Sequence, residues 1–326
     1  MYDDKIVFFW VTSFLKEDYI VKKIRIATRN SPLALWQAKS VRQELIQAHG
    51  DIEIELIGMK TEGDRFLDSS LVNIGGKGLF VKELEEALLR NDADIAVHSM
   101  KDVVVDLPEN LMLHTILKRE DSRDVLISNR YKKINVLPDN SIIGTSSLRR
   151  QSQLKRLCPN IVLKNLRGNV ETRLRKLDDG EFDAVVLAAA GMIRLDLSDR
   201  ITQFVSDSLL LPAIGQGAIG IECRADDFIT QELITPLNHE ETSQCVLAER
   251  AFSRRLQGGC QLPIAAFATI ENTKIILRGL VAKLDGSEII RSEVRGDISD
   301  FENIGISLAD LLLERGADVI LKSYRK

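Results

Sequence analysis

A block of positive charge between residues 144 and 176 is the strongest chemical signal in this sequence. The block holds nine lysines and arginines and one acid, although the 326-residue chain has a net charge of -4. Arg149 and Arg150 follow Thr-Ser-Ser at residues 145–147, where hydroxyls, backbone N–H groups and a helix N-terminus together favour an anion. Arg167-Gly168-Asn169 repeats the arrangement. Because a guanidinium fork suits carboxylate or phosphate, the block predicts a ligand with several negative charges.

Nucleic acid and plain solvation are the alternatives for this block. It contains no Phe, Tyr or Trp on which bases could stack, and the negative net charge argues against a protein that coats nucleic acid or an anionic membrane. A small acidic molecule is therefore the predicted ligand. Near the amino end, Arg29-Asn30-Ser31 offers a further anion site, unless Ser31 serves only as a helix N-cap. Solvated helix faces are the favoured interpretation of four other cations, Lys155, Arg156, Arg175 and Lys176.

The run from His98 to Asp102 places polar side chains directly after an apolar strand, which is where α/β folds carry their chemistry. A carboxylate beside a cation, as Asp102 is beside Lys101, can stay ionised, stabilise a developing positive charge and exchange a proton with a substrate. A turn closed by an Asp–Lys pair is an equally good interpretation of the spacing. The four histidines are scattered, so neither a histidine metal site nor a catalytic triad is predicted.

Three glycine-rich stretches invite ligand-binding interpretations. Residues 215–220 match GxGxxG by their letters, but no strand-glycine-helix unit surrounds them, so a dinucleotide site is rejected. Residues 75–78 lack the spacing of a P-loop and are predicted to form a flexible lid that offers Lys77 to an anion. Gly258-Gly259-Cys260 forms a turn with unusual backbone freedom and an unobstructed thiol. A buried, inert cysteine is the commoner interpretation of such a position.

The remaining compositional signals concern the compartment and the amino terminus. The four cysteines form no CxxC pair, which favours a reducing cytosol. An apolar run at residues 6–15 is too short to span a bilayer, for which about 20 residues are needed. Acids outnumber the single lysine before it, which is unlike a signal peptide. Residues 1–21 are treated as an extension of uncertain status, with a misassigned start and a membrane anchor as alternatives.

Strand and helix patterns alternate along the chain and would bring the polar residues to strand ends. Residues 60–78 have no convincing period. The predicted strands cover residues 22–27, 52–59, 93–100, 125–128, 141–144, 161–166, 184–190, 264–270, 274–284 and 288–295. The predicted helices cover residues 31–49, 79–90 and 241–256, and further helices begin near residues 148, 169 and 301.

This order of elements predicts three domains after the extension. Residues 22–117 and 217–237 form a discontinuous first domain, because the apolar, glycine-containing residues 209–223 can carry the chain back to it. Residues 118–216 form a second α/β domain. Residues 238–326 form a compact α+β domain that carries Cys260.

Taken together, these motifs resemble the porphobilinogen deaminase family. The resemblance runs in order from Lys22 to the carboxyl end and leaves only residues 1–21 without a counterpart. It departs from the family at Val104, where many relatives have proline, and at Glu62, where relatives often carry a basic or neutral residue. The motifs are ATRNSPLALWQA (27–38), GGKGLFVKELE (75–85), DIAVHSMKD (94–102), GTSSLRRQ (144–151), LRGNVETRL (166–174), PAIGQGA (212–218) and GGCQLP (258–263).

The resemblance implies a cytoplasmic, monomeric transferase of tetrapyrrole and haem biosynthesis. Such an enzyme joins four porphobilinogen molecules head to tail and releases hydroxymethylbilane and ammonia. It implies one dipyrromethane cofactor, assembled from two porphobilinogen units and bound through a thioether to Cys260. The implied fold class is α/β: two hinged periplasmic-binding-protein-like α/β domains plus a small C-terminal α+β domain with a three-stranded sheet and helices. Neither nucleic acid nor membrane is an expected partner.

The resemblance also assigns roles to individual residues. Asp102 would contact the pyrrole N–H groups, assist the departure of ammonia, stabilise the azafulvene cation and help to remove the ring proton. A second set would bind the acetate and propionate groups of the substrate and cofactor. Its members are Arg29, Ser31, Lys77, Ser99, Lys101, Thr145, Ser146, Ser147, Arg149, Arg150, Arg167, Gly168, Asn169, Arg173, Arg194 and Gln216. A hinged anion-binding module and a nucleotide-dependent oxidoreductase are the rival interpretations.

Overall fold

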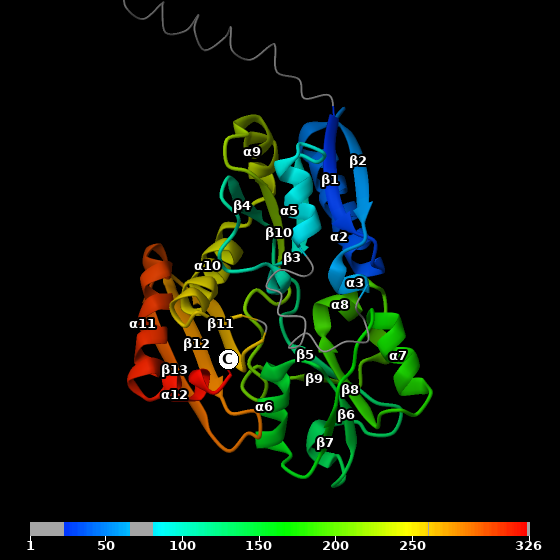
Figure 1. Cartoon of the computed structure of the whole chain (residues 1–326), viewed down its shortest axis with the longest axis vertical. Helices are drawn as coiled ribbons and strands as arrows, with labels where there is room; N and C mark the ends of the chain where they lie inside the picture. The colour runs from blue at the N-terminus through cyan, green and yellow to red at the C-terminus, as the bar shows by residue number, and fades with distance from the viewer. Residues whose placement is uncertain (1–22, 66–80, 260, 325–326) are drawn as a thin grey trace, which may run out of the picture.

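The structure is a computed structural model that describes residues 23–65, 81–259 and 261–324. Three separate sheets organise this part of the chain. Figure 1 shows the first sheet at the top, the second below it, and the three-stranded sheet to the left of both. No helix within the described ranges is both long enough and apolar enough to cross a membrane.

The first sheet has five strands in the order β2-β1-β3-β10-β4. β1 runs parallel to β2 and β3, and β10 runs antiparallel to both of its neighbours. β10 therefore returns from late in the chain to lie between two early strands. The strands are β1 (Lys23–Arg29), β2 (Glu53–Met59), β3 (Ile95–Ser99), β4 (Leu111–Ile116) and β10 (Ile219–Arg224). The associated helices are α2 (Pro32–His49), α3 (Glu62–Arg65), η1 (Met100–Asp102), α5 (Lys82–Leu89), α9 (Phe228–Ile234) and η4 (Thr235–Leu237).

Helix α2 follows β1 because local signals start it and stop it. Ser31 caps its N-terminus by accepting a hydrogen bond from Ala34 N at 3.3 Å, and Pro32 fits the first helical turn. Gly50 ends it at a φ of +70°, and its N–H donates to Ile46 O at 2.9 Å. The apolar face of α2 packs on β1, β3 and β10 with Val41 at its centre.

The second sheet also has five strands, in the order β7-β6-β8-β5-β9. β6 lies parallel to β7 and β8, whereas β5 is antiparallel to β8 and β9. Its strands are β5 (Asp124–Ile127), β6 (Ile142–Gly144), β7 (Val162–Lys164), β8 (Ala184–Ala188) and β9 (Gln203–Val205). Its helices are η2 (Ile134–Val136), α6 (Leu148–Leu157), α7 (Val170–Asp178), α8 (Ala189–Arg194) and η3 (Ser198–Arg200).

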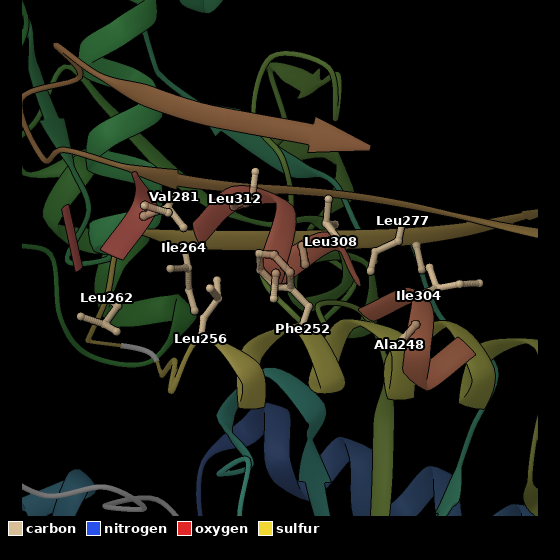
Figure 2. Packing of buried hydrophobic residues seen from close by; sticks show 14 of the residues in the cluster. Ala248, Phe252, Leu256, Leu262, Ile264, Leu277, Val281, Ile304, Leu308 and Leu312 are labelled. Carbon is tan, nitrogen blue, oxygen red and sulfur yellow. The ribbon is translucent and has the colours of Figure 1, made fainter. Parts of the chain in front are cut away.

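The third unit packs helices on an antiparallel sheet in the order β11-β12-β13. Figure 2 shows its core, in which Phe252 from α10 lies against Leu308 from α11 and the face of the sheet. Gly305 lets these helices approach closely, since a Cβ there would lie 2.3 Å from Ala248 O. Its elements are α10 (Glu240–Arg255), β11 (Ile264–Glu271), β12 (Lys274–Ala282), β13 (Ile289–Asp297), η5 (Ile298–Asp300), α11 (Phe301–Glu314) and α12 (Ala317–Lys322).

The predicted fold class is confirmed: two α/β sheets with helices and a small three-stranded α+β unit are present. Several element predictions need correction. The strand predicted to reach residue 190 ends at Ala188, where α8 begins. Strands β4, β9 and β10 were not predicted, although residues 209–223 were expected to carry the chain back to the first sheet unit. A short helix, α3, occupies part of the stretch at 60–78. The domain boundaries given above stay a prediction.

Candidate active site

The carboxyl ends of β1 and β3 carry Arg29, Lys101 and Asp102 toward the second sheet. In Figure 1 the chain enters β1 at the top and runs down toward that sheet. Arg29 is the last residue of β1, and Lys101 and Asp102 belong to η1, the single turn that follows β3. Because parallel strands end at the same edge of a sheet, these residues share one edge. All three are half-buried.

Electrostatic effects show that residues from both α/β units gather at this edge. The pKa of Arg173 is lowered to about 10, mainly by burial and next by the positive charge of Arg150, whereas Asp102 opposes the shift. Arg167 and Arg29 contribute to the same lowering. We call Arg29, Lys101, Arg150, Arg167 and Arg173 the basic cluster.

The pKa of Lys101, in the first sheet unit, is likewise affected by residues of the second sheet unit. Burial is the main cause that lowers the pKa of its ammonium, Arg150 and Arg173 lower it further, and Asp102 and Asp124 oppose them. Among these described residues, cations outnumber carboxylates. An excess of partly buried cations is costly unless an anionic ligand offsets it. The basic cluster is therefore suited to a ligand with several carboxylates.

Asp124, which the sequence analysis missed, holds both arginines of the Arg149-Arg150 pair. Its carboxylate is fully buried at the start of β5. Arg149 donates to it from Nη1 at 2.7 Å, Arg150 from Nη2 at 2.8 Å, and Gln216 from Nε2 at 3.0 Å. The two guanidinium groups hold the pKa of Asp124 well below its usual range against the effect of burial. Arg149 also donates to Leu211 O at 2.8 Å, so its guanidinium is shared among protein groups.

The hydroxyls of residues 145–147 shape the turn between β6 and α6. Ser147 caps α6 by accepting from Arg150 N at 3.4 Å, and Thr145 accepts from Ser147 N at 3.2 Å. Ser146 donates to Leu166 O and accepts from Leu166 N, both at 3.1 Å. The two hydrogen bonds of Ser146 hold this turn against Leu166, the residue before Arg167 in the loop that precedes α7. The predicted binding role of these hydroxyls stays a prediction.

The loop before α7 is built in a similar way. Asn169 caps α7 by accepting from Thr172 N at 2.8 Å. Gly168 has a φ of +108°, a conformation that favours glycine, and a Cβ there would lie 2.7 Å from the Thr172 side chain. The carbonyl of Gly168 accepts from Arg173 Nε at 2.7 Å. The loop therefore orients Arg173 within the basic cluster.

Two further predicted residues lie in contacts between segments. Ser99 and Gln37 exchange hydrogen bonds, with Gln37 Nε2 donating to Ser99 Oγ at 2.8 Å. Arg194 at the end of α8 donates from Nη2 to Gly217 O at 2.7 Å. Its guanidinium also lies over the Trp36 ring of α2, 5.6 Å from the centroid. Arg194 thus ties the second sheet unit to the first.

Lys77 and Cys260 lie outside the described residues. The other three cysteines do have described environments. Burial raises the pKa of Cys223 to about 12, and that of Cys245 also to about 12. Burial also raises the pKa of the half-buried Cys158. Because the thiolate is the reactive form, these three thiols are poor nucleophiles.

A buried acid cluster lies in the first sheet unit, on β3, β10 and α5. His98 Nε2 lies 3.0 Å from Glu222 Oε2, and both side chains are almost completely buried. Within the described part of the chain, Glu85 Oε1 and Glu222 Oε1 have no hydrogen-bond partner. Burial, followed by the charge of Glu222, raises the pKa of Glu85 to about 7, and His98 opposes this. Glu85 therefore titrates near neutral pH.

This cluster predicts a pH-dependent stability that Glu85→Gln should remove. The folded protein binds the Glu85 proton more tightly than the unfolded chain, whose pKa is near 4.5. Native stability should therefore fall as the pH rises from 4.5 to about 7 and then level off. At pH 8 we expect Glu85→Gln to be about 1–2 kcal/mol more stable than native, discounted for residual solvent screening. Urea unfolding at pH 5 and pH 8 measures this difference.

Glu86→Gln is the matched control, because Glu86 is a half-exposed neighbour on α5 that pairs with Arg90 at 3.4 Å. It should change stability little at either pH. If Glu85→Gln is more stable than native by the same amount at both pH values, the Glu85 carboxyl of the native protein does not titrate in this range.

Asp124→Asn should destabilise the fold by about 3–5 kcal/mol, because two buried guanidinium groups lose their shared counter-ion. The depressed pKa means that Asp124 stabilises the protein above its ordinary pKa of 3.8, and that this contribution is lost as the pH falls below that value. Urea unfolding near neutral pH gives the free energy of unfolding. Asp121→Asn is the control, since Asp121 pairs with a part-exposed Arg123. Equal losses of unfolding free energy in the two variants would contradict the role of Asp124 as the shared counter-ion of Arg149 and Arg150.

Comparison with solved structures finds matches at low sequence identity and low TM-score. The periplasmic VFT2 domain of BvgS from Bordetella pertussis is 15% identical, with a TM-score of 0.41 over 72% of this chain and 91% of that one. The periplasmic aliphatic sulphonate binding protein SsuA from Escherichia coli is 14% identical, with a TM-score of 0.40 over 72% of this chain and 71% of that one. A nutrient binding protein from Burkholderia cenocepacia bound to methionine is 14% identical, with a TM-score of 0.41 over 72% of this chain and 96% of that one.

Comparison with family models covers most of the sequence. Residues 24–232 match the model described as porphobilinogen deaminase, dipyromethane cofactor binding domain. Residues 243–314 match the model described as porphobilinogen deaminase, C-terminal domain. The first match alone spans more than half of the chain and contains the whole basic cluster and Asp102. The chain therefore belongs to the porphobilinogen deaminase family.

Proposed function

We propose that this chain joins four porphobilinogen molecules head to tail onto a covalently bound dipyrromethane primer and releases hydroxymethylbilane and ammonia. Family membership makes the chain a hydroxymethylbilane synthase with a dipyrromethane cofactor. The observation that carries the detailed proposal is the basic cluster around Asp102, with cations in excess over carboxylates.

The basic cluster fits both the substrate and the cofactor. Each pyrrole unit carries one acetate and one propionate, so a growing chain accumulates negative charge. Arg29, Lys101, Arg167 and Arg173 would bind these carboxylates, with guanidinium forks making paired hydrogen bonds. Arg150 would add its charge while bound to Asp124. The N-termini of α6 and α7, which follow residues 145–147 and 167–169, favour the same anions.

Asp102 is the proposed acid/base. Its carboxylate is half-buried, and its charge acts on both Lys101 and Arg173. It would accept hydrogen bonds from the pyrrole N–H of porphobilinogen and stabilise the azafulvene cation that forms as ammonia leaves. It would then help to take up the ring proton released on coupling. The bound cofactor supplies the unsubstituted pyrrole carbon that attacks.

Cys260 is the proposed attachment point for the primer. A thioether forms there when the sulfur bonds to the methylene carbon of a porphobilinogen unit and ammonia leaves. A soft sulfur nucleophile suits this carbon. The raised pKa values of Cys223 and Cys245 support the proposal, because those thiols supply little thiolate.

The test is a stoichiometric assay of the purified holoprotein with porphobilinogen. We expect four ammonia molecules for each hydroxymethylbilane, with no nucleotide required. Binding of porphobilinogen without ammonia release would instead indicate an anion-binding module. Dependence on NAD(P)H would indicate the oxidoreductase alternative.

A further inference from the structure

We infer that Arg250 is a positioning residue that holds the turn behind Asp102 in place. Arg250 lies on α10, in the third unit, and is 5% exposed. It donates from Nη1 to Val103 O at 3.3 Å, and from Nη2 to Val104 O at 2.7 Å and Val105 O at 3.0 Å. One guanidinium thus binds three consecutive carbonyls that directly follow the proposed acid/base. The inference rests on the proposed role of Asp102.

The backbone on either side of Asp102 shows why this contact matters. Before it, Met100 N donates to Ala218 O at 3.0 Å, which fixes the start of η1 on the first sheet. After it, Val103 N donates to Met100 O at 3.2 Å, and the chain leaves η1 in an extended conformation. A turn of only three residues has little rigidity of its own. Arg250 supplies a second fixed point on the far side of Asp102.

The chemistry of the guanidinium suits this task. Its planar fork offers donors in fixed directions, so it can align several peptide carbonyls at once, whereas a lysine ammonium is a single point charge. Burial lowers the pKa of Arg250 to about 10, which shows that its charge is desolvated at a cost. Hydrogen bonds from a charged donor to the three carbonyls offset that cost.

The same helix also connects Asp102 to the segment that carries Cys260. The neighbouring Glu249 is fully buried and accepts from Arg119 Nη1 and Nη2, both at 2.8 Å, and from Gly215 N at 2.7 Å. Helix α10 ends at Arg255, five positions before Cys260. Arg250 therefore sets the position of the catalytic turn relative to the helix that leads to the proposed cofactor attachment.

Arg250→Lys tests the inference, with Arg254→Lys as the matched control. Arg254 lies one turn further along α10 and is half-exposed; its side chain donates to Val105 O at 3.5 Å and pairs with Asp106 at 3.4 Å. We expect Arg250→Lys to lower kcat about 10- to 100-fold, since a small misplacement of a catalytic group has effects of this size. The KM for porphobilinogen should change little, because the basic cluster is intact. Arg254→Lys should keep the native kcat and KM.

A rescue variant separates positioning from a general loss of stability. Val103 has φ -76° and ψ 127°, the conformation that a residue before proline adopts. Val104→Pro should therefore stiffen the turn and restore several-fold of the lost kcat in the Arg250→Lys background. Rates are normalised to the folded fraction measured by circular dichroism.

The possible failures are distinguishable. If native protein does not release ammonia from porphobilinogen, the proposed function is wrong. If native protein is active and Arg250→Lys keeps the native kcat, or loses it only in proportion to unfolding, the positioning role is wrong. Equal losses in Arg250→Lys and Arg254→Lys, or a rise in KM alone, would also contradict it. If Val104→Pro by itself lowers kcat, the positioning role is judged from the kcat of Arg250→Lys compared with that of Arg254→Lys.

Discussion

Asp102→Asn should fold normally and lose about 10²- to 10⁴-fold in kcat, the usual contribution of a general acid/base. Asparagine keeps the size of the side chain but carries no charge, so it cannot stabilise the azafulvene cation or take up the ring proton. The basic cluster would also lose a nearby negative charge, because the Asp102 carboxylate opposes the lowering of the pKa of both Lys101 and Arg173. Ammonia release by the purified holoprotein measures the effect.

Asp106→Asn is the control for this prediction. Its side chain is 79% exposed and pairs with Arg254 at 3.4 Å, four positions after Asp102. It should retain native kcat, because an exposed ion pair contributes little. Substantial turnover by Asp102→Asn, or a similar loss in both variants, would contradict the role of Asp102.

Cys260→Ala should yield a folded protein without the dipyrromethane adduct and with essentially no turnover. Alanine has no nucleophilic atom, so no thioether can form and the growing chain has no covalent anchor. Intact mass of protein made in cells that synthesise porphobilinogen gives the result independently of activity. The native protein should exceed its polypeptide mass by two porphobilinogens less two ammonias, and Cys260→Ala should match its polypeptide mass.

Cys158→Ser is the matched control for the attachment site. Cys158 is half-buried, its Sγ lies 3.5 Å from Ile134 O, and it belongs to the second sheet unit. The serine variant should keep the full adduct. An adduct that persists in Cys260→Ala, or that disappears in Cys158→Ser, would place the attachment elsewhere.

The sequence predicted the fold class because apolar residues recur with one period in helices and another in strands, so each element leaves its own local pattern. Helix α2 is an example: Ser31, Pro32 and Gly50 mark its ends within the sequence itself. Strand β9 has only three residues, Gln203–Val205, and no longer strand-like stretch surrounds it, whereas the equally short β6 and β7 lie within the longer predicted strands 141–144 and 161–166. Strand β4 pairs with β10, more than 100 residues later, and local patterns contain no information on such a pairing.

The candidate site was predicted in part for the same reason. Lys101 and Asp102 directly follow a predicted strand, so the rule for strand ends found them, whereas Arg29 was found because Arg29-Asn30-Ser31 precedes a predicted helix. Asp124 was missed because an acid at the start of an apolar strand gives no sign of the two arginines that it binds 25 and 26 positions later.

Arg250 was missed on similar grounds. The carbonyls that it binds lie 145 to 147 positions earlier in the chain. A backbone carbonyl is present at every residue, so the sequence cannot mark it as a partner. Only the packing of α10 against the turn that follows Asp102 reveals the contact.

The central claim is that porphobilinogen units are added one at a time to a primer held covalently by this chain. The most direct measurement is the intact mass of the native holoprotein during stepwise addition of porphobilinogen. Each coupling forms one carbon–carbon bond and releases one ammonia. We expect a ladder of masses, each higher than the last by one porphobilinogen less one ammonia, above a protein that already carries the primer. A protein whose mass equals that of its polypeptide and does not change when porphobilinogen is added would contradict it.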